Sequence, residues 1–217
     1  MTQPLRQNQV PRHSAATLYE AAVSEWQHRK DRRHPEASPE VAVDSAIRPS
    51  WPGARLAGPA FTVRGAGGDN LALHRAVAAA PSHHVLVADL DGAAYGHWGE
   101  VLAVAAQQRG ILGLVIDGGV RDRQELQALN FSVFSRRDSV RGTGKQAPGQ
   151  LNVPIVVGGV QVSTGDLVVG DVDGVVVLPS ERVAAILDEA DRRVAHEHDI
   201  LNALRAGHTT LDLYQLG

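Results

Sequence analysis

The chain has 217 residues, 43% hydrophobic and 21% charged, so it is long enough for one sizeable core and short for two domains. Its 21 basic and 24 acidic residues give a net charge of −3, which provides no general attraction for nucleic acid. The absence of cysteine excludes disulfides, thiolate metal sites and a cysteine nucleophile, and fits a reducing cytoplasm.

The N-terminal residues 1–14 are polar and are expected to form a flexible arm rather than a signal peptide, because they contain no apolar run. No stretch of the sequence approaches the roughly 18 uninterrupted apolar residues of a membrane span. We therefore expect a cytoplasmic protein with no membrane partner. Residues 15–217 are expected to form a single domain, which begins with a helix near 15–26 and a charged, proline-containing loop up to residue 50.

Strands and helices alternate through the middle of the chain. This order predicts parallel strands joined by right-handed crossovers. The predicted strands cover residues 60–64, 84–90, 111–116 and 131–134, and the predicted helices cover 70–79, 99–109 and 123–129.

The pattern changes in the last third of the chain. Valine-rich runs at 153–162, 167–169 and 175–178 predict antiparallel strands, and Asp173-Gly174 is typical of a hairpin turn. A long C-terminal helix is predicted over residues 181–206. The elements add up to a mixed α/β domain with two sheet layers and flanking helices.

A glycine-containing loop follows the predicted strand 84–90 and leads into the helix that starts near residue 99. Backbone N–H groups at a helix N-terminus favour carboxylate or phosphate, and Gly96 and Gly99 permit close approach of a ligand. Many such loops carry glycines only to make a turn, so this loop alone does not establish a site. The sequence contains no dinucleotide fingerprint and no phosphate-binding loop.

A second loop, Asp117 to Asp122, follows the next predicted strand. If the two strands are parallel neighbours, both loops open at the same carboxyl edge of the sheet, where ligands bind in α/β proteins. The Arg121 guanidinium can pair with a carboxylate, and Asp122 can hold a divalent cation whose other ligands are waters. The alternative is that both side chains are solvated at the start of a helix, with Asp122 as its cap.

Glu100, twenty further residues and then Arg121-Asp122 resemble the acidic-X20-Arg-Asp signature of the 4-hydroxy-4-methyl-2-oxoglutarate / 4-carboxy-4-hydroxy-2-oxoadipate aldolases. These class II pyruvate aldolases belong to the RraA-like family, which also contains the RraA regulators of ribonuclease E. The resemblance covers roughly residues 15–207, with supporting segments at 58–63, 68–71, 115–122 and 170–179.

The resemblance implies a three-layer ββα sandwich of the swivelling-domain type, assembled as a homotrimer or homohexamer. It also implies a divalent-metal-dependent lyase that acts on pyruvate-type 2-keto acids. Such an enzyme cleaves substrates like 4-hydroxy-4-methyl-2-oxoglutarate by a retro-aldol reaction, decarboxylates oxaloacetate, or does both, through a pyruvate enolate that the metal stabilises. The alternative is a non-catalytic regulator that binds a ribonuclease or another protein.

The same resemblance implies the roles of individual residues. Asp122 would be the only direct protein ligand of Mg²⁺ or Mn²⁺, Arg121 would bind the keto oxygen and stabilise the enolate, and Glu100 would position a water for proton transfer. Backbone amides would hold the substrate carboxylate. The expected substrate-binding residues are Gly96, His97, Trp98, Gly99, Glu100, Val101 and Arg121.

Two positions favour the enzyme over the regulator. Regulators of the family usually have glycine at the position of Glu100, and an acid where this chain has Leu126. The commoner acid of the aldolases at position 100 is aspartate, so Glu100 lengthens the side chain by one methylene. Glu100 therefore carries most of the distinction between the two functions.

The last helix has an apolar stripe that contains one acid, Glu197, and a carboxylate buried there needs a partner. The stripe consists of Val183, Leu187, Ala190, Val194, Glu197, Leu201 and Leu204. Because the resemblance implies a glutamate from a neighbouring subunit's C-terminal segment at the site, Glu197 is the candidate for that catalytic role, with Glu189 next. The alternative is that Glu197 reaches solvent.

The remaining polar residues give weaker indications. His196 and His198 lie two apart and point to different faces of a helix, so we do not expect a histidine metal site. His97 lies in the glycine-containing loop and is expected either to touch substrate or to lie at the surface. Arg141 and Lys145 are candidates for gating the site or for meeting a distal carboxylate.

Overall fold

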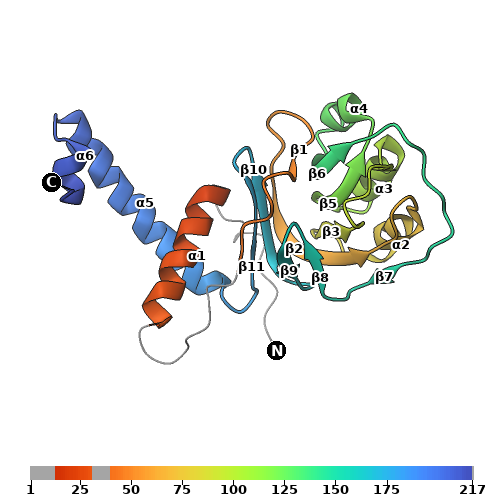
Figure 1. The fold of residues 1–217 in the computed structure, drawn as a ribbon, viewed down its shortest axis with the longest axis horizontal. Coiled ribbons are helices and arrows are strands. Elements are labelled where there is room, and N and C mark those ends of the chain that lie inside the picture. Colours follow the sequence, from red (N-terminus) through yellow and green to blue (C-terminus); the bar gives the residue numbers. More distant parts are fainter. Residues whose placement is uncertain (1–12, 31–39, 217) are drawn as a thin grey trace.

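The computed structural model describes residues 13–30 and 40–216, so most of the arm expected at residues 1–14 lies outside the described residues. Within these ranges the chain forms one mixed sheet of nine strands, a separate hairpin and six helices (Figure 1). The strands are β1 (Arg48–Pro49), β2 (Leu56–Arg64), β3 (Val85–Asp89), β4 (Gly96–Trp98), β5 (Gly113–Val120), β6 (Ser132–Asp138), β7 (Gln150–Leu151), β8 (Ile155–Val157), β9 (Val160–Val162), β10 (Leu167–Asp171) and β11 (Gly174–Leu178). The helices are α1 (Ala15–Lys30), α2 (Leu71–Ala79), α3 (Glu100–Gln108), α4 (Arg123–Ala128), α5 (Val183–Arg205) and α6 (Thr210–Tyr214).

The parallel half of the sheet agrees with the prediction. β2, β3, β5 and β6 lie side by side in this order, and all three pairings between neighbours are parallel. Helices α2, α3 and α4 cover one face of these strands (Figure 1). The strand interiors are almost entirely buried, which is why their sequences are continuous apolar runs rather than alternating ones. The carboxyl ends of the parallel strands therefore share one edge.

The antiparallel half confirms the hairpin predicted at Asp173-Gly174, because β10 pairs with β11 through to Asp171 and Gly174. The single strand predicted over residues 153–162 is wrong. Gly158 and Gly159 adopt φ angles of 53° and 82°, which turn the chain back so that β8 and β9 form their own hairpin. Glycine adopts this left-handed region without the steric cost that a side chain brings.

The sheet curls until it is nearly closed, which produces two sheet layers. β10 pairs with the start of β2, while β3 pairs with its end, so β2 belongs to both layers. Gly170 on β10 faces Phe134 on β6, whose ring would lie 2.9 Å from a Cβ at position 170. The segment at Val41 and Val43 bonds to the free edge of β11 and then leads into β1 on the opposite edge of the sheet.

The N- and C-terminal helices form a second, smaller core. α1 and the first part of α5 pack against apolar side chains of β10 and β11. This core includes Leu18 of α1, Leu178 of β11 and Ile186 of α5. Beyond Ala190 the helix α5 leaves the body of the protein (Figure 1), and Val194 and Leu201 are 44% and 47% exposed. The buried stripe predicted along the whole helix is therefore confirmed only for its first half. No helix in the described part of the chain is long and apolar enough to cross a bilayer.

Candidate active site

The two loops expected to meet do lie side by side. Part of the first loop forms a short strand, β4, which the sequence did not predict and which pairs in parallel with the end of β5. The backbone amide of Arg121 donates to the carbonyl of Trp98 over 2.9 Å. The start of α3 and the Arg121-Asp122 pair therefore adjoin each other at the carboxyl edge of the sheet.

The Asp122 carboxylate lies at the N-terminus of α3. Its Oδ2 accepts a hydrogen bond of 3.0 Å from the backbone amide of Glu100. Asp122 itself has φ 57°, a left-handed conformation that aspartate tolerates better than most residues. Although Asp122 occupies the N-cap position of α4, its side chain makes no capping bond there, so its interpretation as an ordinary cap of that helix is wrong.

The Arg121 side chain is 47% exposed, and its Nε lies 3.6 Å from Asp122 Oδ2. No hydrogen bond of this guanidinium to another described residue is present, so most of its donors are available to a ligand. Its aliphatic part passes against Gly96, where a Cβ would lie 3.1 Å from Arg121 Cδ. The aliphatic part of the Arg121 side chain is thus held by packing, while its guanidinium is exposed.

The amides expected to bind a carboxylate are only partly available. The amide of Gly96 donates to Arg141, that of His97 to Tyr95, and that of Glu100 to Asp122. Among the described residues no acceptor is found for the amides of Gly99 and Val101, nor for that of Leu102, which was not among the expected binding residues. These orphan donors of the first helical turn remain for an anion.

His97 and Trp98 do not present their side chains to a ligand. The indole of Trp98 is buried and stacks on Phe131, with ring centroids 5.9 Å apart. The His97 ring is also buried: its Nε2 accepts from the amide of Gly68 (3.0 Å), and its Nδ1 lies 3.3 Å from the carbonyl of Gly119. The expectation that His97 touches substrate or lies at the surface is therefore wrong, because the ring fills the space between the turn at Gly68 and the strand β5.

Burial lowers the pKa of His97, and hydrogen bonds to the carbonyls of Gly119 and Tyr95 oppose that shift. A neutral ring fits the geometry. Since Nε2 accepts from an amide, the single ring proton belongs on Nδ1, where it is donated to Gly119. The imidazole therefore has a structural role, because it joins the turn at Gly68 to the strand β5.

A cleft of about 520 Å³ opens beside the Arg121-Asp122 pair. Glu100 and the amides of α3 are not part of its wall and adjoin it only through Asp122. The cleft is lined by Val120, Arg121, Asp122, Arg123, Gln124, Glu125, Asp138, Ser139 and Val140. Asp138 and Ser139 were missed because the strand of β6 was predicted to end at Phe134, although the same carboxyl-edge rule that pointed to Arg121 applies to the end of β6.

The residues at this point fit a water-rich divalent cation. Asp122 lines the cleft and is 36% exposed, and its Oδ1 accepts no hydrogen bond from a described residue. In the described part of the chain no three acidic or histidine side chains cluster as a ready-made metal site. Mg²⁺ tolerates one carboxylate with waters as the other ligands, so a single free oxygen facing an open cleft suits it.

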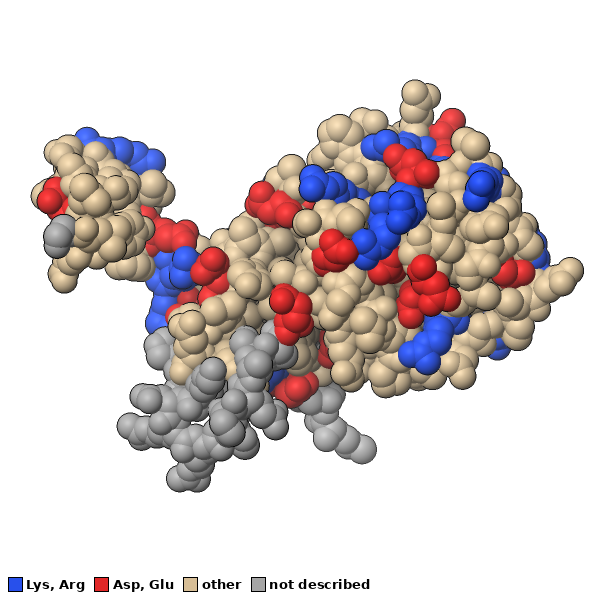
Figure 2. All heavy atoms as spheres, in the orientation of Figure 1, with Lys and Arg blue, Asp and Glu red and all other residues tan. Residues whose placement is uncertain are grey.

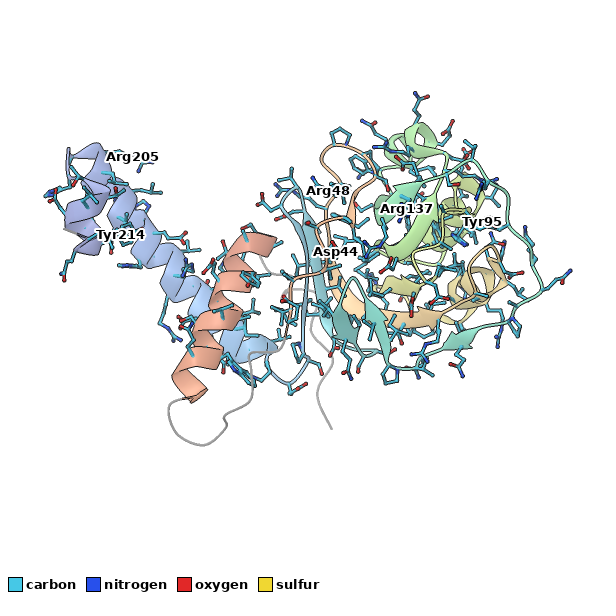
Figure 3. All side chains as sticks on the ribbon, viewed as in Figure 1. Asp44, Arg48, Tyr95, Arg137, Arg205 and Tyr214 are labelled. Atoms are coloured by element: carbon cyan, nitrogen blue, oxygen red, sulfur yellow. The ribbon has the colours of Figure 1, made fainter. Side chains whose placement is uncertain are left out.

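The two candidate glutamates lie in different places. Glu100 is exposed on the first turn of α3, next to the Asp122 carboxylate. Glu197 is 48% exposed on the projecting part of α5, where it pairs with Arg193 over 3.1 Å. Arg205 and Tyr214, at the far end of this arm, lie at the opposite end of the molecule from Tyr95, which is next to β4 (Figure 3). Within one chain, Glu197 is therefore not brought to the cleft, and it reaches solvent, which was the alternative to burial in the apolar stripe.

The loop that carries Arg141 and Lys145 is anchored on both sides. The Arg141 guanidinium lies 5.8 Å from the centre of the Tyr95 ring, and Asp69 accepts from the amide of Gln146 over 2.6 Å. Neither basic side chain lines the cleft. On the face shown in Figure 2, acidic and basic side chains are interspersed.

The curled mixed sheet, with Arg121, Asp122 and the N-terminus of α3 at one carboxyl edge, places the chain in the class of α/β proteins whose candidate ligand site lies at that edge of the sheet. The chain belongs to the RraA-like family (aldolase/RraA), whose model matches residues 21–177. The family expected from Glu100 and Arg121-Asp122 is thus confirmed.

Similar proteins in this family carry two kinds of name, aldolase and RraA-type ribonuclease inhibitor. The chain is 38% identical over 156 residues to a Halalkalibacterium halodurans protein named "Putative 4-hydroxy-4-methyl-2-oxoglutarate aldolase", covering 71% of this chain and 74% of that protein. An uncharacterized protein of Pseudomonas syringae has a similar structure, with TM-score 0.80, 26% identity and coverage of 99% and 96%. Streptomyces coelicolor RraAS2, described as an unusual member of the RNase ES inhibitor RraA family, gives TM-score 0.75, 25% identity and coverage of 92% and 100%.

Proposed function

We propose that this protein is a divalent-metal-dependent carbon–carbon lyase that acts on pyruvate-type 2-keto acids. The observation that carries the proposal is a single point at the carboxyl edge, where Arg121 and Asp122 line the cleft and Asp122 is hydrogen-bonded to the first turn of α3. Substrates of the type of 4-hydroxy-4-methyl-2-oxoglutarate, and oxaloacetate, both contain the α-keto carboxylate that such a point would hold. The aldolase name of a relative at 38% identity supports this choice.

The chain offers a distinct partner for each polar group of the substrate. The amides of Gly99 and Val101 have no other acceptor in the described chain and would receive the substrate carboxylate. The half-exposed Arg121 guanidinium would donate to the keto oxygen. In this role the donor would stand where negative charge develops, and it would stabilise the enolate more than the ketone.

The two reactions break the same carbon–carbon bond and pass through the same enolate. In the retro-aldol reaction the C3–C4 bond breaks, its electron pair moves to C3, and the C4 hydroxyl loses its proton to become the carbonyl of the second product. In the decarboxylation of oxaloacetate the same electron pair moves to C3 and carbon dioxide leaves. The enolate then gains a proton at C3, so 4-hydroxy-4-methyl-2-oxoglutarate gives two pyruvates and oxaloacetate gives one.

Glu100 and Asp122 would supply the remaining functions. Glu100 is exposed beside Asp122 and would hold the water that takes or gives the proton. Asp122 would be the protein ligand of Mg²⁺ or Mn²⁺. When bound, this cation supplies Lewis-acid polarisation of the keto acid, so no Schiff-base lysine is needed.

We further propose that the lyase is a homo-oligomer, a trimer or hexamer, in which Glu197 of one subunit reaches the site of another. The exposure of Glu197 on an arm that leaves the body is what makes such a reach feasible. The predicted cytoplasmic location and the predicted absence of nucleic-acid and membrane partners remain predictions.

A non-catalytic regulator that binds a ribonuclease is the second candidate, favoured by the similarity to RraAS2. The test is to incubate the purified protein with oxaloacetate or 4-hydroxy-4-methyl-2-oxoglutarate and Mg²⁺ or Mn²⁺, and to measure pyruvate. Because free cations also decarboxylate oxaloacetate, the reference is the Asp122→Ala variant at the same metal concentration. Turnover above this reference that EDTA removes supports the lyase; its absence with both substrates would favour the regulator.

A further inference from the structure

Glycine is needed at position 99 because of the Asp122 side chain and not because of the backbone conformation. Gly99 has φ −159° and ψ −168°, an extended conformation that any residue adopts. A Cβ at this position would lie 2.2 Å from Asp122 Oδ2 and 3.1 Å from both Asp122 Cγ and Arg121 Cγ. A side chain at position 99 and the observed carboxylate position therefore exclude each other.

The neighbouring Gly96 differs in what a side chain would meet. A Cβ there would lie 2.6 Å from the backbone carbonyl of Ser139, so substitution would disturb the main chain. At Gly99 the closest atom is instead the end of a rotatable side chain, which can swing away at little cost to the fold. Alanine at position 99 is thus expected to move one carboxylate and leave the structure intact.

We propose that Gly99 is a positioning residue whose missing side chain lets the Asp122 carboxylate dock on the Glu100 amide and present its other oxygen to the cleft. This inference rests on the proposed function for its catalytic consequence, and on geometry alone for the docking. The 3.0 Å bond from Glu100 uses Oδ2, and Oδ1 has no partner among the described residues. With alanine at position 99 the carboxylate would leave the amide, and the metal-ligand oxygen would lose its fixed direction.

The experiment compares Gly99→Ala with Gly142→Ala in the full-length protein. Gly142 is the matched control, because it is exposed, has no positive φ, and a Cβ there would meet no atom within 4 Å. Three quantities are measured: Mn²⁺ affinity by titration calorimetry, kcat/KM for oxaloacetate, and the hydrogen-exchange protection of the Glu100 amide by NMR. Gly99→Ala should weaken Mn²⁺ binding and lower kcat/KM by about 10- to 100-fold, as loss of a ligand-orienting contact does. Its thermal unfolding should match that of Gly142→Ala.

A double variant shows whether Gly99 acts through Asp122. In an Asp122→Asn background, Gly99→Ala should cause little further loss, because the carboxylate that it displaces is already gone. An additional loss as large as in the wild type would overturn the proposal, as would unchanged hydrogen-exchange protection of the Glu100 amide in Gly99→Ala. If the wild type neither binds Mn²⁺ nor turns over, the proposed function fails, while the hydrogen-exchange protection of the Glu100 amide still decides whether Gly99 positions Asp122.

Discussion

Asp122 accepts a hydrogen bond from the backbone amide of Glu100, which lies twenty-two positions earlier in the chain. The bond joins the loop after β5 to the helix after β4, and so ties the Arg121-Asp122 pair to the open amides of α3. It also means that the carboxylate occupies part of the helix N-terminus that would otherwise be free for an anion. The amides of Gly99 and Val101 then remain as hydrogen-bond donors without an acceptor in the described chain. The groups around the bond can each be tested by substitution.

Replacing Asp122 with Ala should abolish stimulation by Mg²⁺ or Mn²⁺ and lower kcat by about 100-fold or more, since a bound cation is worth several kcal/mol. The protein should remain folded, because the side chain is 36% exposed and makes no capping bond to its own helix. Metal titrations of the rate and size-exclusion chromatography check the two parts. Near-normal metal-dependent rates would remove Asp122 from the site.

Replacing Arg121 with Lys should lower kcat/KM by about 10- to 100-fold although the charge is kept. Lysine is a point charge and cannot reproduce the planar fork that meets a keto acid. The variant should be as stable as the wild type, because the guanidinium has only a loose contact of 3.6 Å with Asp122. Steady-state kinetics with both substrates is the measurement, and equal kcat/KM would refute the role of Arg121.

Replacing Glu100 with Gln should lower kcat by about 100-fold or more with a smaller effect on KM, because it removes a group that handles protons and not one that binds the keto acid. Glu100→Asp should recover much of the rate, since aspartate is the commoner acid at this position in the aldolases that the chain resembles. Glu181→Gln is the control for loss of an exposed carboxylate. If Glu100→Gln and Glu181→Gln have the same kcat, Glu100 is not the proton-handling group.

Replacing His97 with Leu should lower the free energy of unfolding by roughly 2–4 kcal/mol, since the amide of Gly68 and the carbonyl of Gly119 both lose a buried partner. The effect should also depend on pH. The pKa of His97 is lowered in the folded protein, so protonation favours the unfolded chain, and wild-type stability should fall as the pH drops below about 6.5.

Denaturant unfolding at pH 8 and pH 5.5 checks this prediction for His97. In His97→Leu the part of the pH dependence that comes from the imidazole disappears, so its loss of stability should be larger at pH 8 than at pH 5.5. His208→Gln, which changes an exposed histidine, should follow the wild type at both values. An equal destabilisation of His97→Leu at the two pH values would contradict the assignment of a neutral, linking ring.

Replacing Glu197 with Gln should lower kcat without changing the stability of the subunit, because Glu197 is 48% exposed on the projecting part of α5. Its proposed action on a neighbouring subunit can be tested by mixing. Oligomers reassembled from Glu197→Gln and Asp122→Ala subunits should regain activity, since some sites then combine an intact Asp122 with an intact Glu197 of a neighbour. If each variant is inactive alone and the mixture also stays inactive, Glu197 does not act between subunits.

Much of the fold follows from local sequence patterns. Continuous apolar runs at β3 and β5, with helical spacing between them, indicate buried parallel strands, and Asp173-Gly174 indicates the hairpin of β10 and β11. Where prediction failed, a long-range contact decided the outcome. β4 exists because residues 96–98 pair with the end of β5, and no local preference of Gly-His-Trp indicates a strand.

The sequence by itself determined that Arg121 and Asp122 follow one parallel strand and a glycine-containing loop follows its neighbour, because the order of strands and helices places their ends at one edge. Only the tertiary structure decided which way each group points. It buried His97 between the turn at Gly68 and the strand β5, gave three of the expected amides other acceptors, and carried Glu197 away from the body on α5. Those outcomes depend on packing between residues far apart in the chain, whereas helical and strand periodicity reports only how neighbouring residues are patterned.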